Sequence, residues 1–160
     1  MLALLLAACA RPGPAAGGAT KTVGDWFPIG VGDRTVPMQL AITEPEMAHG
    51  LMGRTDLGPD QGMLFVYARP TPMSFWMRNT PLALDIGFFS PEGELKEIYP
   101  MYPYDDTTVA SRDRRLQFAL EMRQGWFAAH GVRPGARLDL AALRAALQAR
   151  GAAPADFGLP

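Results

Sequence analysis

The sequence of 160 residues contains a single cysteine, Cys9, and two histidines. One cysteine excludes an intrachain disulfide, and it excludes zinc sites built from four cysteines or from two cysteines and two histidines. No apolar run reaches the roughly 20 residues that a membrane-spanning helix requires. The net charge is −1, and basic residues are dispersed apart from the short stretch 112–115. We therefore expect no nucleic-acid partner, and nothing in the sequence predicts a metal ion or a cofactor.

The chain begins with an apolar segment, residues 1–9, that ends at this cysteine. The run Leu-Ala-Ala-Cys at 6–9 is typical of a bacterial lipobox, in which a small residue precedes a lipidated cysteine. Residues 10–22 follow, rich in Pro and Gly at first and without periodicity, and we expect them to form a flexible tether. This pattern predicts an exported protein of the bacterial cell envelope, anchored on the periplasmic side by a lipid on Cys9 alone. The alternative is a frayed apolar terminus with a chance cysteine.

Short runs with the two-residue period of β-strands dominate the middle of the chain. Residues 36–42 and 116–122 alternate clearly, which predicts strands with one buried face, whereas the continuously apolar run 63–67 predicts a strand covered on both faces. Further strands are expected over 73–78, 84–89, 95–99 and near Leu138, with a turn at 90–93 that makes a hairpin of two of them. The sequence thus predicts a mainly β (α+β) fold: a compact β-sandwich or partly closed barrel of about six or seven short strands with small peripheral helices.

The run Thr-Glu-Pro-Glu at 43–46 predicts the start of a short helix. Thr43 and Glu46 have the spacing of a capping box, and Pro suits the first helical turn. The apolar stripe that follows predicts a helix to about Met52, ended by Gly53.

A second helix is predicted near the C-terminus, where Leu140, Leu143 and Leu147 recur at helical spacing before Gly151. Because the strand pattern ends near Leu138, we expect one β-domain over 23–140. The helix over 141–151 should then add only docking stability, and residues 152–160 should be loose.

Four segments resemble the signature of an uncharacterised bacterial and archaeal family, domain of unknown function 192, also called uncharacterised protein family 0127. They are GLMGRTDL at 50–57, GMLFVY at 62–67, SFWMRNTPLALD at 74–85 and FALEMRQGWFAAHGVRPG at 118–135. Together they cover most of 36–140 in the expected order. The resemblance implies no activity, because the family has no established biochemistry.

The most informative segment is 74–85, where charged and polar residues interrupt large apolar ones, since buried charges are costly unless they are paired. Arg78 and Asp85 could meet across neighbouring strands and, with Trp76, grip a small polar ligand. Alternatively, they could simply pin a turn. Arg54 and Glu121, in other family-like segments, could join this cluster or remain solvated. The candidate ligand-binding residues are Arg54, Trp76, Arg78, Asn79, Thr80, Asp85 and Glu121.

Two further hypotheses concern catalysis and metal binding. Asp85 and Glu121 are both expected to point away from the apolar face of their strands, and such a carboxylate pair could support acid–base hydrolysis. Met47, His49 and Met52 lie close together on the first predicted helix, where core filling is favoured over a copper site.

These observations leave three hypotheses. The first is an envelope-tethered domain that binds a small ligand or an envelope protein without performing chemistry. The second is a hydrolase-type enzyme that uses Asp85 and Glu121. The third is a purely structural lipoprotein.

Overall fold

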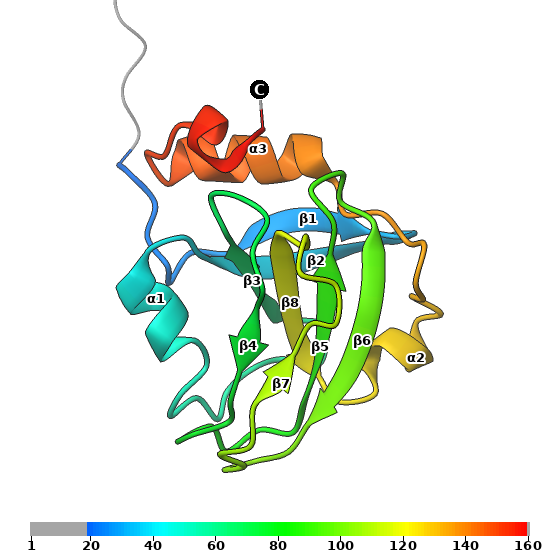
Figure 1. The fold of residues 1–160 in the computed structure, drawn as a ribbon. Coiled ribbons are helices and arrows are strands. Elements are labelled where there is room, and N and C mark those ends of the chain that lie inside the picture. Colours follow the sequence, from blue (N-terminus) through cyan, green and yellow to red (C-terminus); the bar gives the residue numbers. More distant parts are fainter. Residues whose placement is uncertain (1–18, 160) are drawn as a thin grey trace, which may run out of the picture.

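A computed structural model describes residues 19–159, which fold around a curved β-sheet with helices on both of its faces (Figure 1). Cys9 and most of the predicted tether lie outside the described residues. Within the described part, none of the helices combines the length and hydrophobicity needed to cross a membrane.

The main sheet has six strands in the order β1-β2-β3-β8-β5-β6. Strands β2 and β3 run parallel, and the other neighbouring pairs are antiparallel. The strands span Phe27–Val31 (β1), Arg34–Ala41 (β2), Gly62–Val66 (β3), Leu84–Phe89 (β5), Leu95–Met101 (β6) and Phe118–Arg123 (β8). A small second sheet pairs β4 (Ser74–Phe75) with β7 (Val109–Ala110).

This architecture confirms the predicted mainly β fold and the predicted hairpin of β5 and β6. Strands β1 and β6 are the two edges of the main sheet, so the sheet is open and the fold is sandwich-like, not a closed barrel. Near Leu138 there is no strand of any length: this residue makes a single bridge to Val31 of β1.

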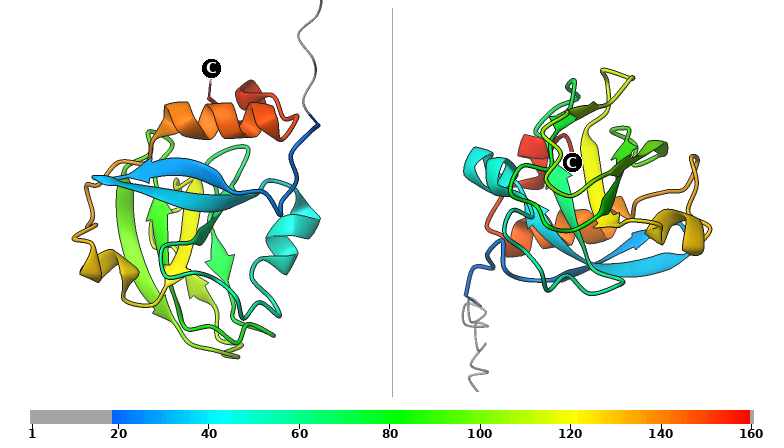
Figure 2. Two further views of the ribbon diagram at one scale, coloured as in Figure 1. Left: turned by 180° about the vertical axis from the view of Figure 1, so that it is seen from behind. Right: turned by 90° about the horizontal axis from the view of Figure 1, so that it is seen from below.

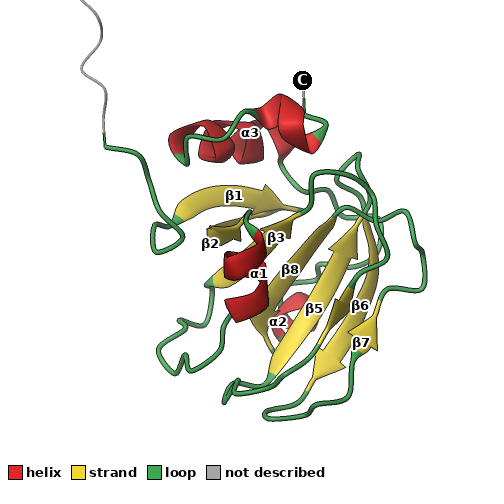
Figure 3. Ribbon diagram, turned by 60° about the vertical axis from the view of Figure 1, so that its left-hand side comes forward, coloured by secondary structure: helices red, strands yellow, loops and turns green. Residues whose placement is uncertain are grey.

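Both faces of the sheet are covered, which differs from the expectation of one buried face for β2 and β8. Residues 118–122 of β8 are all buried. Helices α1 (Glu44–His49) and α2 (Trp126–Ala129) lie on opposite sides of the sheet (Figure 3). Because successive side chains in a strand point to opposite faces, β8 contributes to two separate hydrophobic cores.

We name the two cores by the helices that cover them. The α3-side core lies against α2 and the C-terminal helix, and the α1-side core lies against α1, β4 and β7. Leu120 and Met122 of β8 belong to the α3-side core, whereas Ala119 belongs to the α1-side core.

Helix α1 begins as predicted. The Thr43 hydroxyl accepts a hydrogen bond from the Glu46 N–H, and the Glu46 carboxylate accepts one from the Thr43 N–H, which completes the capping box. The helix ends three residues earlier than expected, at His49. Gly50 ends it because its φ of 49° lies in the left-handed region, which is open to glycine.

The C-terminal segment packs on the domain, and residues 152–159, which were expected to be loose, include a short 3₁₀ helix with a buried side chain. Helix α3 (Leu140–Ala149) lies across β1 (Figure 2). Leu143 and Leu147 are fully buried in the α3-side core, and the short 3₁₀ helix η1 (Pro154–Phe157) adds Phe157 to the same core. The alternating strand pattern ends near Leu138, but one face of the sheet still has to be covered by residues that follow it.

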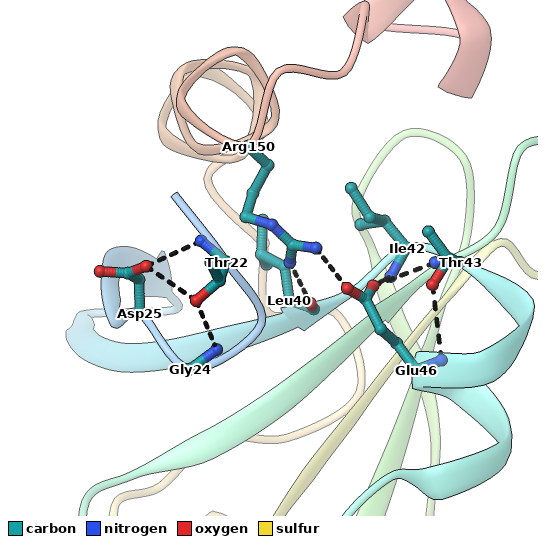
Figure 4. A network of polar contacts seen from close by, with 8 residues as sticks. All are labelled: Thr22, Gly24, Asp25, Leu40, Ile42, Thr43, Glu46 and Arg150. Atoms are coloured by element: carbon teal, nitrogen blue, oxygen red, sulfur yellow. Dashed lines mark hydrogen bonds and ion pairs between the residues drawn. The ribbon is translucent and has the colours of Figure 1, made fainter. Parts of the chain in front are cut away.

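A polar network ties α3 to β2 and α1 (Figure 4). Arg150, which follows α3, donates hydrogen bonds to the Leu40 carbonyl and to the Glu46 carboxylate. At the same end of α3, the Lys21 N–H donates to the Ala149 carbonyl at 2.9 Å. The last residues of the predicted tether are therefore attached to the domain.

Candidate functional site

The candidate site is a cavity of about 300 Å³ on the α1-side of the sheet. Its walls come from α1 and the turn after it, from β3, and from β4 with the segment that follows. Its lining residues are Met47, Ala48, His49, Gly50, Leu51, Met52, Phe65, Tyr67, Ser74, Phe75, Trp76, Thr80 and Glu121. Such a volume is at the small end of the range for ligand pockets.

Glu121 sits in the centre of the sheet, at the base of this cavity. It lies on β8, directly opposite Met63 of β3 on one side and Ile86 of β5 on the other. Directly opposed residues in antiparallel strands share a face, so the Glu121 side chain points into the α1-side core with Met63 and Ile86. The sheet thus places a carboxyl group among apolar neighbours.

The environment of this carboxyl group is unusual. Glu121 is only 4% exposed, and none of the hydrogen bonds or ion pairs found within residues 19–159 engages its side chain. Burial alone raises its pKa from an ordinary 4.5 to about 8, because the charged form loses its hydration. At neutral pH the group is therefore mostly protonated and can donate a hydrogen bond.

Tyr67 lies near enough to Glu121 for the charge of Glu121 to affect the Tyr67 pKa. Burial raises the pKa of the Tyr67 phenol, and the negative charge of Glu121 raises it further. Because both residues line the cavity, it presents a phenol and a carboxyl group to the same space. The Thr80 hydroxyl, which donates to the Arg78 carbonyl at 3.3 Å, is a third polar group there.

Aromatic rings form much of the remaining wall. Phe65 and Phe75 meet edge to face, with ring centroids 4.9 Å apart, which is a favourable arrangement for two rings. Trp76 is 44% exposed and lies at the solvent side. The site therefore combines a buried acid at its base with an aromatic wall that extends to the surface.

Of the residues proposed from the sequence, the structure brings Trp76, Thr80 and Glu121 together in this cavity. Arg78 points elsewhere: its guanidinium lies over the Trp76 ring, 4.2 Å from the centroid, and its Nε donates to Asp106 at 3.1 Å. Both members of this ion pair are exposed. Asn79 occupies the turn, with a φ of 55°.

Asp85 does not pair with Arg78, which corrects that expectation. It is paired with Met122 of β8, the residue after Glu121. Its side chain therefore points to the α3-side face, away from that of Glu121. There it accepts a hydrogen bond from the Gly125 N–H at 2.7 Å, just before α2. Burial raises the pKa of Asp85, and this N–H opposes the rise.

The proposed carboxylate pair is therefore wrong as a geometry, since Asp85 and Glu121 point to opposite faces of the sheet. Both side chains were expected to point away from the single apolar face of their strands. The sheet instead has an apolar core on each face. Two carboxyl groups on either side of a sheet cannot act on one bond.

Arg54 also lies outside the cavity. Its Nε donates to Asp56 at 2.9 Å, a second nitrogen donates to the Gln39 side chain, and the guanidinium stands 5.3 Å from the Trp26 ring centroid. These contacts join the turn after α1 to the start of the domain.

Several lining residues were missed or assigned another role. Met47 and Met52 were expected to fill the core, with His49 at the edge of their stripe. Met47 does pack against the α1-side core, and all three residues also line the cavity. Tyr67 and Ser74 were not singled out, because a lone hydroxyl in a strand has no distinctive sequence signal. Within residues 19–159, no group of three or more His, Cys, Asp or Glu side chains is arranged to hold a metal ion.

A second polar cluster lies on the other side of the molecule. Asp60 accepts from the Trp126 indole at 3.0 Å and lies 3.3 Å from Nε2 of His130, whose ring stacks on Trp126. The other ring nitrogen of His130 lies 2.9 Å from the Trp126 carbonyl. These contacts hold α2 against the loop before β3.

A family model described as "Uncharacterized ACR", that of domain of unknown function 192, matches residues 28–140. The chain resembles a solved protein of unknown function from Novosphingobium aromaticivorans DSM 12444 at 34% identity and a TM-score of 0.68, over 78% of this chain and 93% of that one. It also resembles a protein from Sinorhizobium meliloti 1021, described as a candidate transcription regulator, at 33% identity and a TM-score of 0.64. That similarity covers 66% of this chain and 81% of the other. No curated protein matches the chain.

Proposed function

The chain belongs to the domain of unknown function 192 family, which is described only as uncharacterised, and we propose from its cavity that it binds a small ligand. The observation that carries this proposal is Glu121: a carboxyl group that is 4% exposed, unpaired among the described residues and directed into a cavity. Burying such a group without a partner costs several kcal/mol. Strongly perturbed carboxyl groups in a cavity are typical of functional sites.

The rest of the cavity supports binding in preference to chemistry. A few polar groups converge within largely apolar and aromatic walls, as in small-molecule sites. The hydrolase alternative loses its carboxylate pair, because Asp85 lies on the opposite face. A purely structural role does not explain Glu121, since an apolar residue would fill the position without the free-energy cost of burying a carboxyl group.

We also propose that the domain acts in the bacterial envelope, tethered by a lipid on Cys9. The support is the Leu-Ala-Ala-Cys run and the Pro- and Gly-rich segment after it. Binding of a ligand by a tethered domain would then take place at the membrane surface.

A cavity-blocking variant tests the binding proposal. Ala48 is exposed on α1 and lines the cavity, so Ala48→Trp should obstruct it without disturbing a core. Ala145→Trp, at an exposed position of α3, is the matched control. In a screen of small metabolites by ¹H–¹⁵N NMR, we expect some compounds to shift the amides of Tyr67, Trp76 and Glu121 in the wild type and in the control, but not in Ala48→Trp. Shifts that persist in Ala48→Trp would contradict a ligand site in this cavity.

A further inference from the structure

We propose that the cavity takes a small organic cation with a primary ammonium group on an apolar or aromatic body, and that the Glu121 carboxylate neutralises it. This inference rests on the proposed ligand-binding function and adds the chemical class of the ligand.

The first argument is charge. The cavity is lined by one acidic side chain, Glu121, and by neither Lys nor Arg. An anionic ligand would be repelled by the carboxylate form of Glu121, so it could bind only while this group stays protonated. A cationic ligand supplies the counter-charge that the described residues lack, and a buried carboxylate is stabilised most by a directly bonded cation.

The second argument is hydrogen bonding. A primary ammonium group has three N–H donors and no acceptor, so it needs a site made of acceptors. The carboxylate of Glu121 can accept from it, and the hydroxyl oxygens of Tyr67, Ser74 and Thr80 in the same cavity can accept the rest. A ligand built around a carbonyl could accept from these hydroxyl groups, but it would supply no cation to the Glu121 carboxylate.

The third argument is the aromatic wall of the cavity. Cations are attracted to the faces of aromatic rings, most strongly of Trp and Tyr, within about 6 Å. Tyr67, Phe75 and Trp76 all line the cavity. The volume of about 300 Å³ limits the ligand to a small molecule, of the size of a single ring with a short side chain.

Binding of such a cation must be linked to a proton. The free carboxyl group of Glu121 has a pKa of about 8, so below that pH it has to release a proton before it can pair with the ammonium. The affinity should therefore rise about tenfold for each pH unit as the pH approaches 8. The other titratable groups that line the cavity are Tyr67, which stays neutral in this range because its pKa is raised, and His49 at the exposed end of α1.

Three probes of similar size test the inference: benzylamine, benzyl alcohol and benzoate. Each is titrated into the full chain at pH 6, 7 and 8 and followed by the ¹H–¹⁵N shifts of Tyr67, Trp76 and Glu121. We expect benzylamine to bind at least tenfold more tightly than benzyl alcohol, and benzoate to bind more weakly than either. Calorimetry in two buffers of different ionisation enthalpy should show release of nearly one proton per benzylamine at pH 6.

Two variants locate the effect. Glu121→Gln keeps the shape of the side chain but cannot become charged, so it should weaken benzylamine at least tenfold and abolish proton release, with little effect on benzyl alcohol. Asp85→Asn removes a carboxyl group from the opposite face of the neighbouring strand and should leave benzylamine binding and proton release unchanged.

The outcomes separate the two proposals. If benzyl alcohol or benzoate binds in the cavity as tightly as benzylamine, or if benzylamine binding is unchanged in Glu121→Gln, the cation is wrong while the ligand site stands. If none of the three probes shifts the cavity amides at millimolar concentration, and the metabolite screen is also silent, the ligand site itself is contradicted.

Discussion

Arg150, just after α3, forms an ion pair with Glu46 in the first turn of α1, more than a hundred positions away in the sequence. The Arg150 side chain is 6% exposed and the Glu46 side chain 19%. Burial pushes the pKa of Glu46 upward, but the Ile42 N–H and the Arg150 guanidinium outweigh it, so this pKa lies below its usual value. The Glu46 carboxylate thus has two roles. It caps α1, which forms one wall of the cavity, and it binds Arg150 of the C-terminal segment.

We expect the chain to require its C-terminal segment for folding. Removing 141–159 takes away Leu143, Leu147 and Phe157 from the α3-side core. Truncation of one buried Leu to Ala costs about 2–5 kcal/mol, and typical domains have only about 5–15 kcal/mol in total. A chain ending at Leu140 should therefore lose cooperative unfolding in far-UV circular dichroism with denaturant. A cooperative transition in that chain would show that α3 is an accessory.

The ion pair should contribute to the stability on its own. Arg150→Ala leaves the partly buried Glu46 without its cation but with its hydrogen bonds from the Ile42 and Thr43 N–H groups, so we expect a cost of about 1–3 kcal/mol. Arg144→Ala, one residue after Leu143 on the same helix, is the comparison for loss of a helical arginine. Urea unfolding at pH 7 measures both, and equal effects of the two substitutions would contradict a special role for the pair.

Glu121 should make the wild-type protein less stable as pH rises. Its pKa is raised on folding, so the folded state binds a proton more tightly than the unfolded state between pH 4.5 and about 8. Stability therefore falls across that window, by up to about 5 kcal/mol. Glu121→Gln cannot titrate and should not show this fall, so it should be more stable than the wild type at pH 9 but not at pH 4. Parallel pH dependences of the two Tm curves would contradict the unpaired, buried state of Glu121.

Asp85 and Arg78 should behave as independent residues. Asp85→Ala leaves the Gly125 N–H without its acceptor, which costs about 1–3 kcal/mol. Arg78→Ala removes an exposed ion pair with Asp106 and should cost about 1 kcal/mol or less. A double-mutant cycle by urea unfolding should give a coupling energy near zero. A large coupling would mean that these two residues meet after all.

The lipid anchor is a prediction from the sequence that cell fractionation can test. Cys9→Ser should move the protein expressed in its bacterial host from the membrane to the soluble fraction. Intact mass analysis of the wild-type protein should show the added acyl chains. A serine variant that stays with the membrane, together with an unmodified wild-type mass, would reject the anchor.

The strands and the capping box could be predicted because they depend on local patterns. Alternation identifies strands, and the spacing of Thr43 and Glu46 identifies a helix start. The direction in which Glu121 points was not predictable in the same way. Its neighbours Leu120 and Met122 alternate with it, which suggested a solvent face, but α1 and the β4 segment cover that face from far away in the sequence.

The site was found only in part for a related reason. Trp76 and Thr80 stand out as unusual residues in an apolar segment, and they do line the cavity. The pairing of Arg78 with Asp106 depends on a loop contact across 28 residues, which no periodicity reveals. The burial of the C-terminal helix likewise depends on which sheet face lacks cover.

The place of β8 in the sheet has a consequence for biosynthesis. This strand lies between β3 and β5, yet it is the last strand to be made. A nascent chain that has not yet reached residue 118 carries two strands with no partner between them, and unpaired edges invite association with other chains. The domain can complete its sheet only after residues 118–123 have been made, so chains that stall before this point should be prone to aggregation.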